Sequence, residues 1–74
     1  MLRFRLKELI ADKQFKEGRR VTLDEIASAT GIHRTTLSKV ANQRGYNASA
    51  DIIDKLCTFF DVEVGDLVLR VSED

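Results

Sequence analysis

The sequence predicts a compact all-α domain, and three observations favour this fold class. The 74 residues suffice for one domain with one small core. The composition, 43% hydrophobic and 32% charged, is typical of an ordinary globular chain and not of a disordered one. Apolar residues recur at helical spacing along most of the chain, which contains no proline. We therefore expect residues 1–74 to form a single domain of helices joined by short breaks.

The first two helices are predicted from residue spacing and from a capping pattern. Over residues 3–13, apolar side chains fall on one side of a helix. The second helix is expected over residues 23–30, and its start is well marked. Thr22 and Glu25 have the spacing of a capping box, in which each side chain satisfies the other's free backbone amide.

Two further helices and an ambiguous tail follow. The third helix is predicted over residues 34–42. The fourth begins near Ser49, whose hydroxyl can cap the first turn, and it carries a broad apolar stripe. Gly65 is expected to break the chain again. The tail at 66–71 fits either a helical turn or an extended strand, because it combines helical spacing with β-branched residues.

Residues 22–42 have the pattern of two helices that meet at a steep angle. Ala27 is the small residue that such a pair needs where the helices cross closely. Gly31 can adopt the positive φ that a three-residue turn requires. The apolar residues that would point into a shared core are Ile26, Ile32, Leu37 and Val40. Together these residues predict a helix-turn-helix.

The charges are divided unevenly along a chain whose formal net charge is zero. Residues 1–47 contain ten Lys and Arg against five Asp and Glu, which gives +5. Residues 48–74 contain two basic residues against seven acidic ones, which gives −5. This asymmetry indicates one face for a polyanion and another for a different partner, although chance segregation on a solvated surface is the alternative.

Several classes of protein are not indicated. No apolar run approaches membrane-spanning length, and the N-terminal residues lack the apolar core of a signal peptide. The single cysteine, Cys57, excludes an internal disulfide and a cysteine-rich metal site. No carboxylate pairs with a histidine or cysteine cluster, and no phosphate-binding glycine loop is present. We therefore expect a cytoplasmic protein that is not an enzyme and needs no cofactor, metal, small-molecule ligand or membrane.

Four segments of the sequence resemble the Xre/Cro family of helix-turn-helix regulators, which have the lambda-repressor-like fold. These are Thr22-Leu-Asp-Glu-Ile-Ala27, Gly31-Ile-His-Arg-Thr-Thr-Leu-Ser38, Ala41-Asn42, and the stretch from Leu56 to Leu67. The resemblance implies a five-helix domain whose third helix enters the DNA major groove. It also implies homodimers on palindromic operators and a role in regulating transcription, most commonly repression.

The same resemblance assigns candidate DNA contacts. Arg34 would form a bidentate pair with guanine, and Thr35 would touch a thymine methyl or hydrogen-bond a base. Ser38 and Lys39, one turn later, would face the same way. Asn42 resembles the family residue that helps to hold the DNA backbone, and Thr36 is a second backbone contact. Thr22 and His33 are further candidate backbone contacts, although many members have Ser or Thr where this chain has His33.

The sequence departs from the family pattern near the expected phosphate contacts. Many members have Gln where this chain has Leu23, and the loops on either side of the helix-turn-helix are longer here. We therefore expect phosphate clamping to depend on other residues, which are Arg19, Arg20, Arg44 and Tyr46.

Several residues have more than one interpretation. His33 is a pH-sensitive phosphate contact or, more simply, a neutral cap or exposed residue, because a helix N-terminus disfavours a cation. Cys57 is a redox sensor or a buried, unreactive thiol on an apolar stripe. Phe15, Phe59 and Phe60 stack on bases or, as their spacing indicates, contribute to the core or to a dimer.

The leading functional hypothesis is sequence-specific binding of double-stranded DNA by a homodimer that regulates transcription. The second is a protein-interaction module, such as an antitoxin-like partner protein, that uses the same fold without DNA. The acidic C-terminal third and the apolar residues of 67–71 motivate it. A small enzyme is the least supported hypothesis, because the necessary polar constellation is missing.

Overall fold

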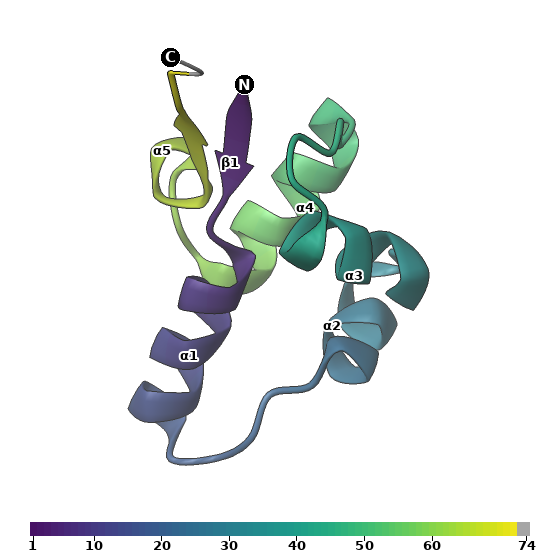
Figure 1. The fold of residues 1–74 in the computed structure, drawn as a ribbon. Helices are drawn as coiled ribbons and strands as arrows, with labels where there is room; N and C mark the ends of the chain where they lie inside the picture. The colour runs from purple at the N-terminus through teal and green to yellow at the C-terminus, as the bar shows by residue number, and fades with distance from the viewer. Residues whose placement is uncertain (73–74) are drawn as a thin grey trace.

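The computed structural model describes residues 1–72, and in that part of the chain it contains five helices and one pair of short strands. The predicted all-α fold of five helices is confirmed, with a strand pair added at its ends. The elements in chain order are β1 (Leu2–Phe4), α1 (Leu6–Glu17), α2 (Leu23–Thr30), α3 (Arg34–Asn42), α4 (Ala50–Phe60), α5 (Val64–Leu67) and β2 (Val68–Arg70) (Figure 1).

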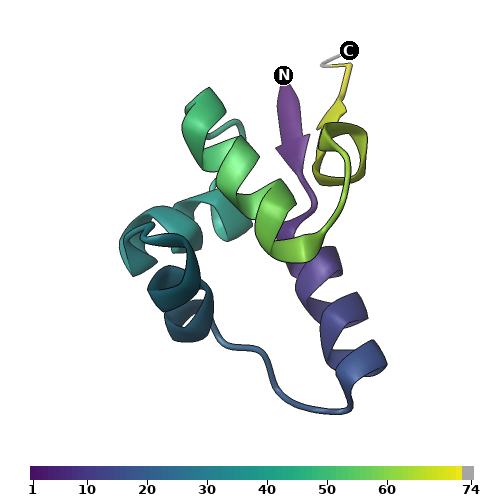
Figure 2. The ribbon, with the colours of Figure 1, turned by 180° about the vertical axis from the view of Figure 1, so that it is seen from behind.

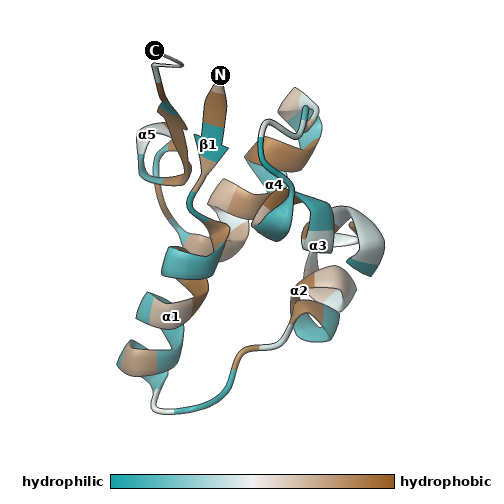
Figure 3. Ribbon diagram, viewed as in Figure 1, coloured by the Kyte–Doolittle hydropathy of each residue, from teal (hydrophilic) through white to brown (hydrophobic). Residues whose placement is uncertain are grey.

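Helix α4 packs against α2 and α5, and α1 contacts α3 directly. The view from behind shows the same arrangement, with a long loop joining the end of α1 to the start of α2 (Figure 2). Each of the longer helices carries both hydrophobic and hydrophilic residues, as an amphipathic helix that contributes one side to a core must (Figure 3). No helix within residues 1–72 combines the length and the apolar character that crossing a membrane would need.

The core joins side chains from all five helices and from the two turns beside α2. Five leucines and isoleucines in it are fully buried, and each comes from a different helix. The buried hydrophobic residues are Leu6, Leu9, Val21, Ile26, Ile32, Leu37, Val40, Leu56 and Leu67. A core of this kind fixes α2 and α3 on the rest of the domain.

The chain ends form a two-stranded antiparallel ribbon, which corrects one sequence prediction and decides between the alternatives left open for the tail. Leu2 pairs with Arg70, and Phe4 pairs with Val68. The first helix therefore begins at Leu6 and not at residue 3, because the backbone groups of β1 hydrogen-bond to β2. In the ambiguous tail, residues 68–70 are strand, while the residues before them belong to α5.

One turn assignment also needs correction. Gly65 does not break the chain, because it lies inside α5. The turn before α5 is made by Asp61, which ends α4 with φ at 55°. Asn and Asp tolerate this left-handed region better than most residues. The start of α5 is stabilised by Asp66, whose carboxylate accepts a hydrogen bond from the amide of Glu63 at 3.1 Å.

The aromatic residues have different environments. Phe59 and Phe60 are half-buried, pack against the core and meet edge to face with ring centroids 4.9 Å apart. The Lys13 ammonium lies 5.1 Å from the centroid of the Phe59 ring. Phe15 is 90% exposed, so the expectation of a core contact is wrong for this residue. It lies on a side of α1 that no element within residues 1–72 covers.

Candidate functional site

The helix-turn-helix has the boundaries that the sequence predicted. The Thr22 hydroxyl caps α2 by accepting a hydrogen bond from the Glu25 amide at 3.1 Å. Gly31 ends α2 with φ at 78°, a conformation that favours glycine. Sequence reasoning missed the part played by Thr30. Its hydroxyl donates to the Ile26 carbonyl at 2.7 Å and accepts from the Ile32 amide at 3.2 Å, which ties the turn together.

Helix α3 divides into a buried side and a polar side. Leu37 and Val40 are buried in the core. Arg34, Thr35 and Lys39 are exposed, while Ser38 and Thr36 are half-buried. The four residues predicted to read bases therefore come from one short helix whose inner side is anchored in the core. The predicted contact residue Asn42 is exposed, and its side-chain amide donates to the Ser38 carbonyl at 3.0 Å.

Arg34 pairs with a carboxylate on the preceding helix. Its Nε lies 3.0 Å from Oδ1 of Asp24, which is in the first turn of α2. The side chains are 67% and 77% exposed respectively. Exposed pairs of this kind contribute about 0–1 kcal/mol, so the contact biases the arginine's orientation more than it stabilises the fold. The sequence pattern did not single out Asp24, because the pairing spans the turn between two helices.

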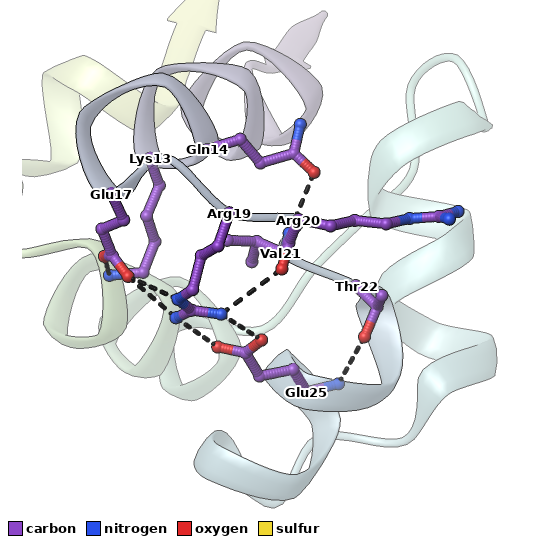
Figure 4. Close-up of polar contacts among 8 residues, drawn as sticks. All are labelled: Lys13, Gln14, Glu17, Arg19, Arg20, Val21, Thr22 and Glu25. Atoms are coloured by element: carbon purple, nitrogen blue, oxygen red, sulfur yellow. Dashed lines mark hydrogen bonds and ion pairs between the residues drawn. The ribbon is translucent and has the colours of Figure 1, made fainter.

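Arg19 is held by two carboxylates at the entrance to α2 (Figure 4). Its Nη1 and Nη2 donate to the two carboxylate oxygens of Glu25 at 2.7 and 2.8 Å. Its Nε donates to Glu17 at 2.9 Å, and Glu17 also pairs with Lys13 at 2.6 Å. We call Arg19, Glu17 and Glu25 the α1–α2 clamp, because they connect the end of α1 to the start of α2.

The α1–α2 clamp lowers the pKa of both carboxyl groups. The hydrogen bond from Arg19 is the main cause for Glu25, and that from Lys13 is the main cause for Glu17, with Arg19 adding to it. The pKa of Arg19 is raised in return, chiefly by its hydrogen bonds to Glu25. Each group is thus held in its charged form by opposite charge nearby.

The clamp also corrects the predicted capping box. The Thr22 half forms, but the Glu25 carboxylate turns to Arg19 and does not reach back to the Thr22 amide. A charged guanidinium offers a stronger hydrogen bond than a neutral amide does, which explains the choice. The adjacent Val21 amide donates instead to the side chain of Gln14 at 2.9 Å, so α1 holds this loop at a second point.

The other predicted phosphate contacts lie around the ends of α2 and α3. Arg20 follows Arg19 in the chain, but its side chain extends away from the clamp (Figure 4). His33 occupies the N-cap position of α3, where it is exposed and its side chain caps no amide. Arg44 is exposed just beyond α3. Tyr46 is half-buried and packs against the core, which leaves less of it available to a ligand.

Cys57 is half-buried within α4. Burial raises the pKa of its thiol, and the nearby acidic residues raise it further. The thiol is therefore protonated near neutral pH, and the thiolate needed for redox chemistry is scarce. Within residues 1–72, no three His, Cys, Asp or Glu side chains gather closely enough to hold a metal ion.

Comparison with known protein families gives one result of direct bearing. The family model for the Cro/C1-type helix-turn-helix DNA-binding domain matches residues 5–73, which is nearly the whole chain. This match includes α2, the turn at Gly31 and α3, and it confirms the resemblance described from the sequence. A comparison with curated proteins found no match.

Proposed function

The chain belongs to the Cro/C1-type helix-turn-helix DNA-binding family, and on that premise we propose that it reads specific DNA sequences by placing α3 in the major groove. The observation that carries the proposal is the division of α3 between a buried side and a polar side. An α-helix fits the major groove of B-DNA, where each base pair presents a distinct pattern of donors and acceptors. The polar side of α3 supplies matching groups from a rigid support.

Four side chains of α3 would contact bases in this arrangement. Arg34 at the start of the helix would donate two hydrogen bonds to the O6 and N7 atoms of a guanine. Thr35 would touch a thymine methyl or hydrogen-bond a neighbouring base. Ser38 and Lys39, one turn further on, would extend the same strip. Contacts of this type discriminate between bases, whereas phosphate contacts fix only the position of the protein.

The DNA backbone would be held from both ends of the helix pair. Arg20 and Arg44 are exposed cations suited to phosphates, and their contacts would make binding weaken steeply with salt. The polar residues that would add weaker backbone contacts are Thr22, His33, Thr36, Asn42 and Tyr46. Arg19 differs from these, because its guanidinium is already occupied by two carboxylates. We propose that it supports the position of α2 and does not bind phosphate itself.

We further propose a homodimer that represses transcription in the cytoplasm by occupying its operator. One helix reads only a few base pairs, so two symmetrically placed helices would supply most of the selectivity. Apolar residues that remain exposed on the strands, on α5 and just after β2 could form a contact between two copies. These residues are Leu2, Val64, Leu69 and Val71. Sedimentation showing only monomer at high micromolar concentration would contradict the dimer.

Selection of bound duplexes from a random pool tests the proposed function directly. We expect a palindromic consensus for the wild-type chain. Arg34→Ala should cost about 1–3 kcal/mol and relax the preference at one base position. If Arg34→Ala selects the same consensus with the same affinity, α3 is not reading bases through this residue.

A protein-interaction module is the second candidate, favoured by the exposed apolar residues Leu69 and Val71 and by the acidic C-terminal third. It predicts no retardation of any duplex, even at low salt, where the electrostatic contribution to DNA binding is strongest. Either function acts by binding. We accordingly propose no catalytic role for the chain.

A further inference from the structure

The contact between Asp24 and Arg34 involves one edge of the guanidinium and leaves its two terminal nitrogens without a hydrogen bond to the described part of the chain. The carboxylate of Asp24 is paired with Nε, on the inner edge of the guanidinium. The terminal nitrogens, Nη1 and Nη2, donate no hydrogen bond to a protein group within residues 1–72. These two nitrogens form a planar fork that matches the two acceptors of guanine. The nearest approach of Asp24 is therefore to the one nitrogen that an end-on contact with guanine does not need.

The position of Asp24 also favours its role in orienting Arg34. It lies in the first turn of α2, whereas Arg34 is the first residue of α3. The two helices are held rigidly by the buried core and the tied turn, so the carboxylate is a fixed point from which to aim the arginine. An arginine side chain otherwise has many rotamers, and ordering it on binding costs conformational entropy.

We propose that Asp24 is a positioning residue that sets DNA specificity by orienting Arg34 toward a guanine. The inference rests on the proposed function, because it assumes that α3 reads bases. Two effects combine. Asp24 lowers the entropy lost when Arg34 meets guanine, and its negative charge, close to the DNA surface, disfavours every duplex on which the guanine contact is missing. Asp24 thus raises specific binding relative to non-specific binding.

These opposite effects on specific and non-specific affinity distinguish a positioning role of Asp24 from a purely structural one. An acid in the first turn of a helix also interacts favourably with the helix dipole, and losing it lowers stability slightly. Such a loss would weaken all DNA binding together. Removal of a positioning acid should instead change two affinities in opposite directions.

The experiment measures the affinity of Asp24→Asn for the preferred site found by selection and for an unrelated duplex, at two salt concentrations. We expect the ratio of specific to non-specific affinity to fall about two- to fivefold, the range for an exposed ion pair. We expect affinity for the unrelated duplex to rise about twofold at low salt, because one repulsive charge is gone.

Asp51→Asn is the matched control. Asp51 also lies in the first turn of a helix, is 71% exposed and pairs with a basic side chain, Lys55 at 3.0 Å, but it belongs to α4. It makes the same change in net charge outside the helix-turn-helix, and we expect it to leave the specificity ratio unchanged. Equal melting temperatures for the two variants would show that both are folded.

The double variant Asp24→Asn/Arg34→Ala decides the mechanism. In the Arg34→Ala background, Asp24→Asn should no longer alter the specificity ratio, because no arginine remains to be oriented. The inference is overturned if Asp24→Asn leaves the ratio unchanged, raises it, or lowers it equally without Arg34. If selection finds no preferred site, the proposed function fails too. If Arg34→Ala lowers the ratio and Asp24→Asn does not, only this inference fails.

Discussion

Two arginines flank α2, and the structure uses them differently. Arg19, before the helix, has Nε and both terminal nitrogens engaged by Glu17 and Glu25. Arg34, after the turn, meets a single carboxylate through Nε. The residue type and the charge are the same. What differs is how many donors each guanidinium has left for a ligand.

Basic residues therefore cannot be counted as DNA contacts by charge alone. A guanidinium surrounded by carboxylates is a structural connection, and binding phosphate would require breaking it first. A guanidinium with one carboxylate at its inner edge is oriented and still has free donors. The excess of positive charge in residues 1–47 therefore overstates the number of basic side chains that are available to bind a polyanion.

The largest expected effect is the loss of stability when a core residue of α3 is removed. Leu37 is fully buried in the core on the inner side of α3. Leu37→Ala should lower the free energy of unfolding by about 2–5 kcal/mol, because it leaves a cavity as well as losing apolar contact. Urea unfolding followed by circular dichroism measures this. Thr35→Ala, on the exposed side of the same helix, should stay within about 0.5 kcal/mol of the wild type. Equal midpoints for the two variants would contradict the assignment of buried and exposed sides.

Substituting each arginine in turn should distinguish a role in stability from a role in base recognition. Arg34→Ala should lose about 1–3 kcal/mol of discrimination between sites and leave the melting temperature nearly unchanged, since its ion pair is exposed. Arg19→Ala should lower the melting temperature and leave discrimination unchanged, because it disconnects α1 from α2. Thermal unfolding and binding to the selected site, measured on both variants, would reveal this crossed pattern. If Arg19→Ala instead lost discrimination between DNA sites at an unchanged melting temperature, Arg19 would be a base-contacting residue.

Salt dependence should distinguish Arg19 from its neighbour Arg20. Arg20→Ala should reduce the slope of log affinity against log salt by about one, as expected for one lost phosphate contact. Arg19→Ala should leave that slope unchanged, because its charge is already neutralised within the α1–α2 clamp. Titrations with one duplex at several salt concentrations give the slopes. A smaller slope for Arg19→Ala would show that the clamp opens on DNA.

The smallest expected effect is a dependence of stability on pH. The pKa values of Glu25 and Glu17 lie below their usual value of 4.5 in the folded chain. Their stabilising contribution is therefore complete above pH 4.5 and is lost as the pH falls through the folded pKa values, where the unfolded chain binds more protons. Melting temperatures from about pH 6 to about pH 3 should fall less steeply for Arg19→Ala than for the wild type. Arg20→Ala should retain the wild-type slope.

The helix-turn-helix could be predicted because its signals are local. Thr22 caps its own helix three residues on, and Gly31 ends that helix by its own φ. Ser49 acts in the same way at the start of α4. Each signal lies within a few residues of what it determines, so spacing alone was sufficient.

The rest depends on contacts between distant residues. Strand β1 has no partner until the chain returns with β2, so the sequence around residues 3–4 alone predicts the start of a helix. The pairing of Glu25 with Arg19, and that of Asp24 with Arg34, depend on how side chains meet across a loop or a turn. Phe15 has the spacing of a core residue, but no element of the described chain covers it. Periodicity does not identify the facing partner.

The ribbon between the chain ends also bears on the order in which the molecule assembles. The amide of Val71 donates to the carbonyl of Met1 at 2.8 Å, so the ribbon closes a loop that contains every helix. Closing so long a loop costs more chain entropy than forming the local contacts of α2 with α3. We expect α2 and α3 to form and pack early in folding, and β1 and β2 to pair late. Weakening the ribbon should then speed unfolding and leave the folding rate almost unchanged.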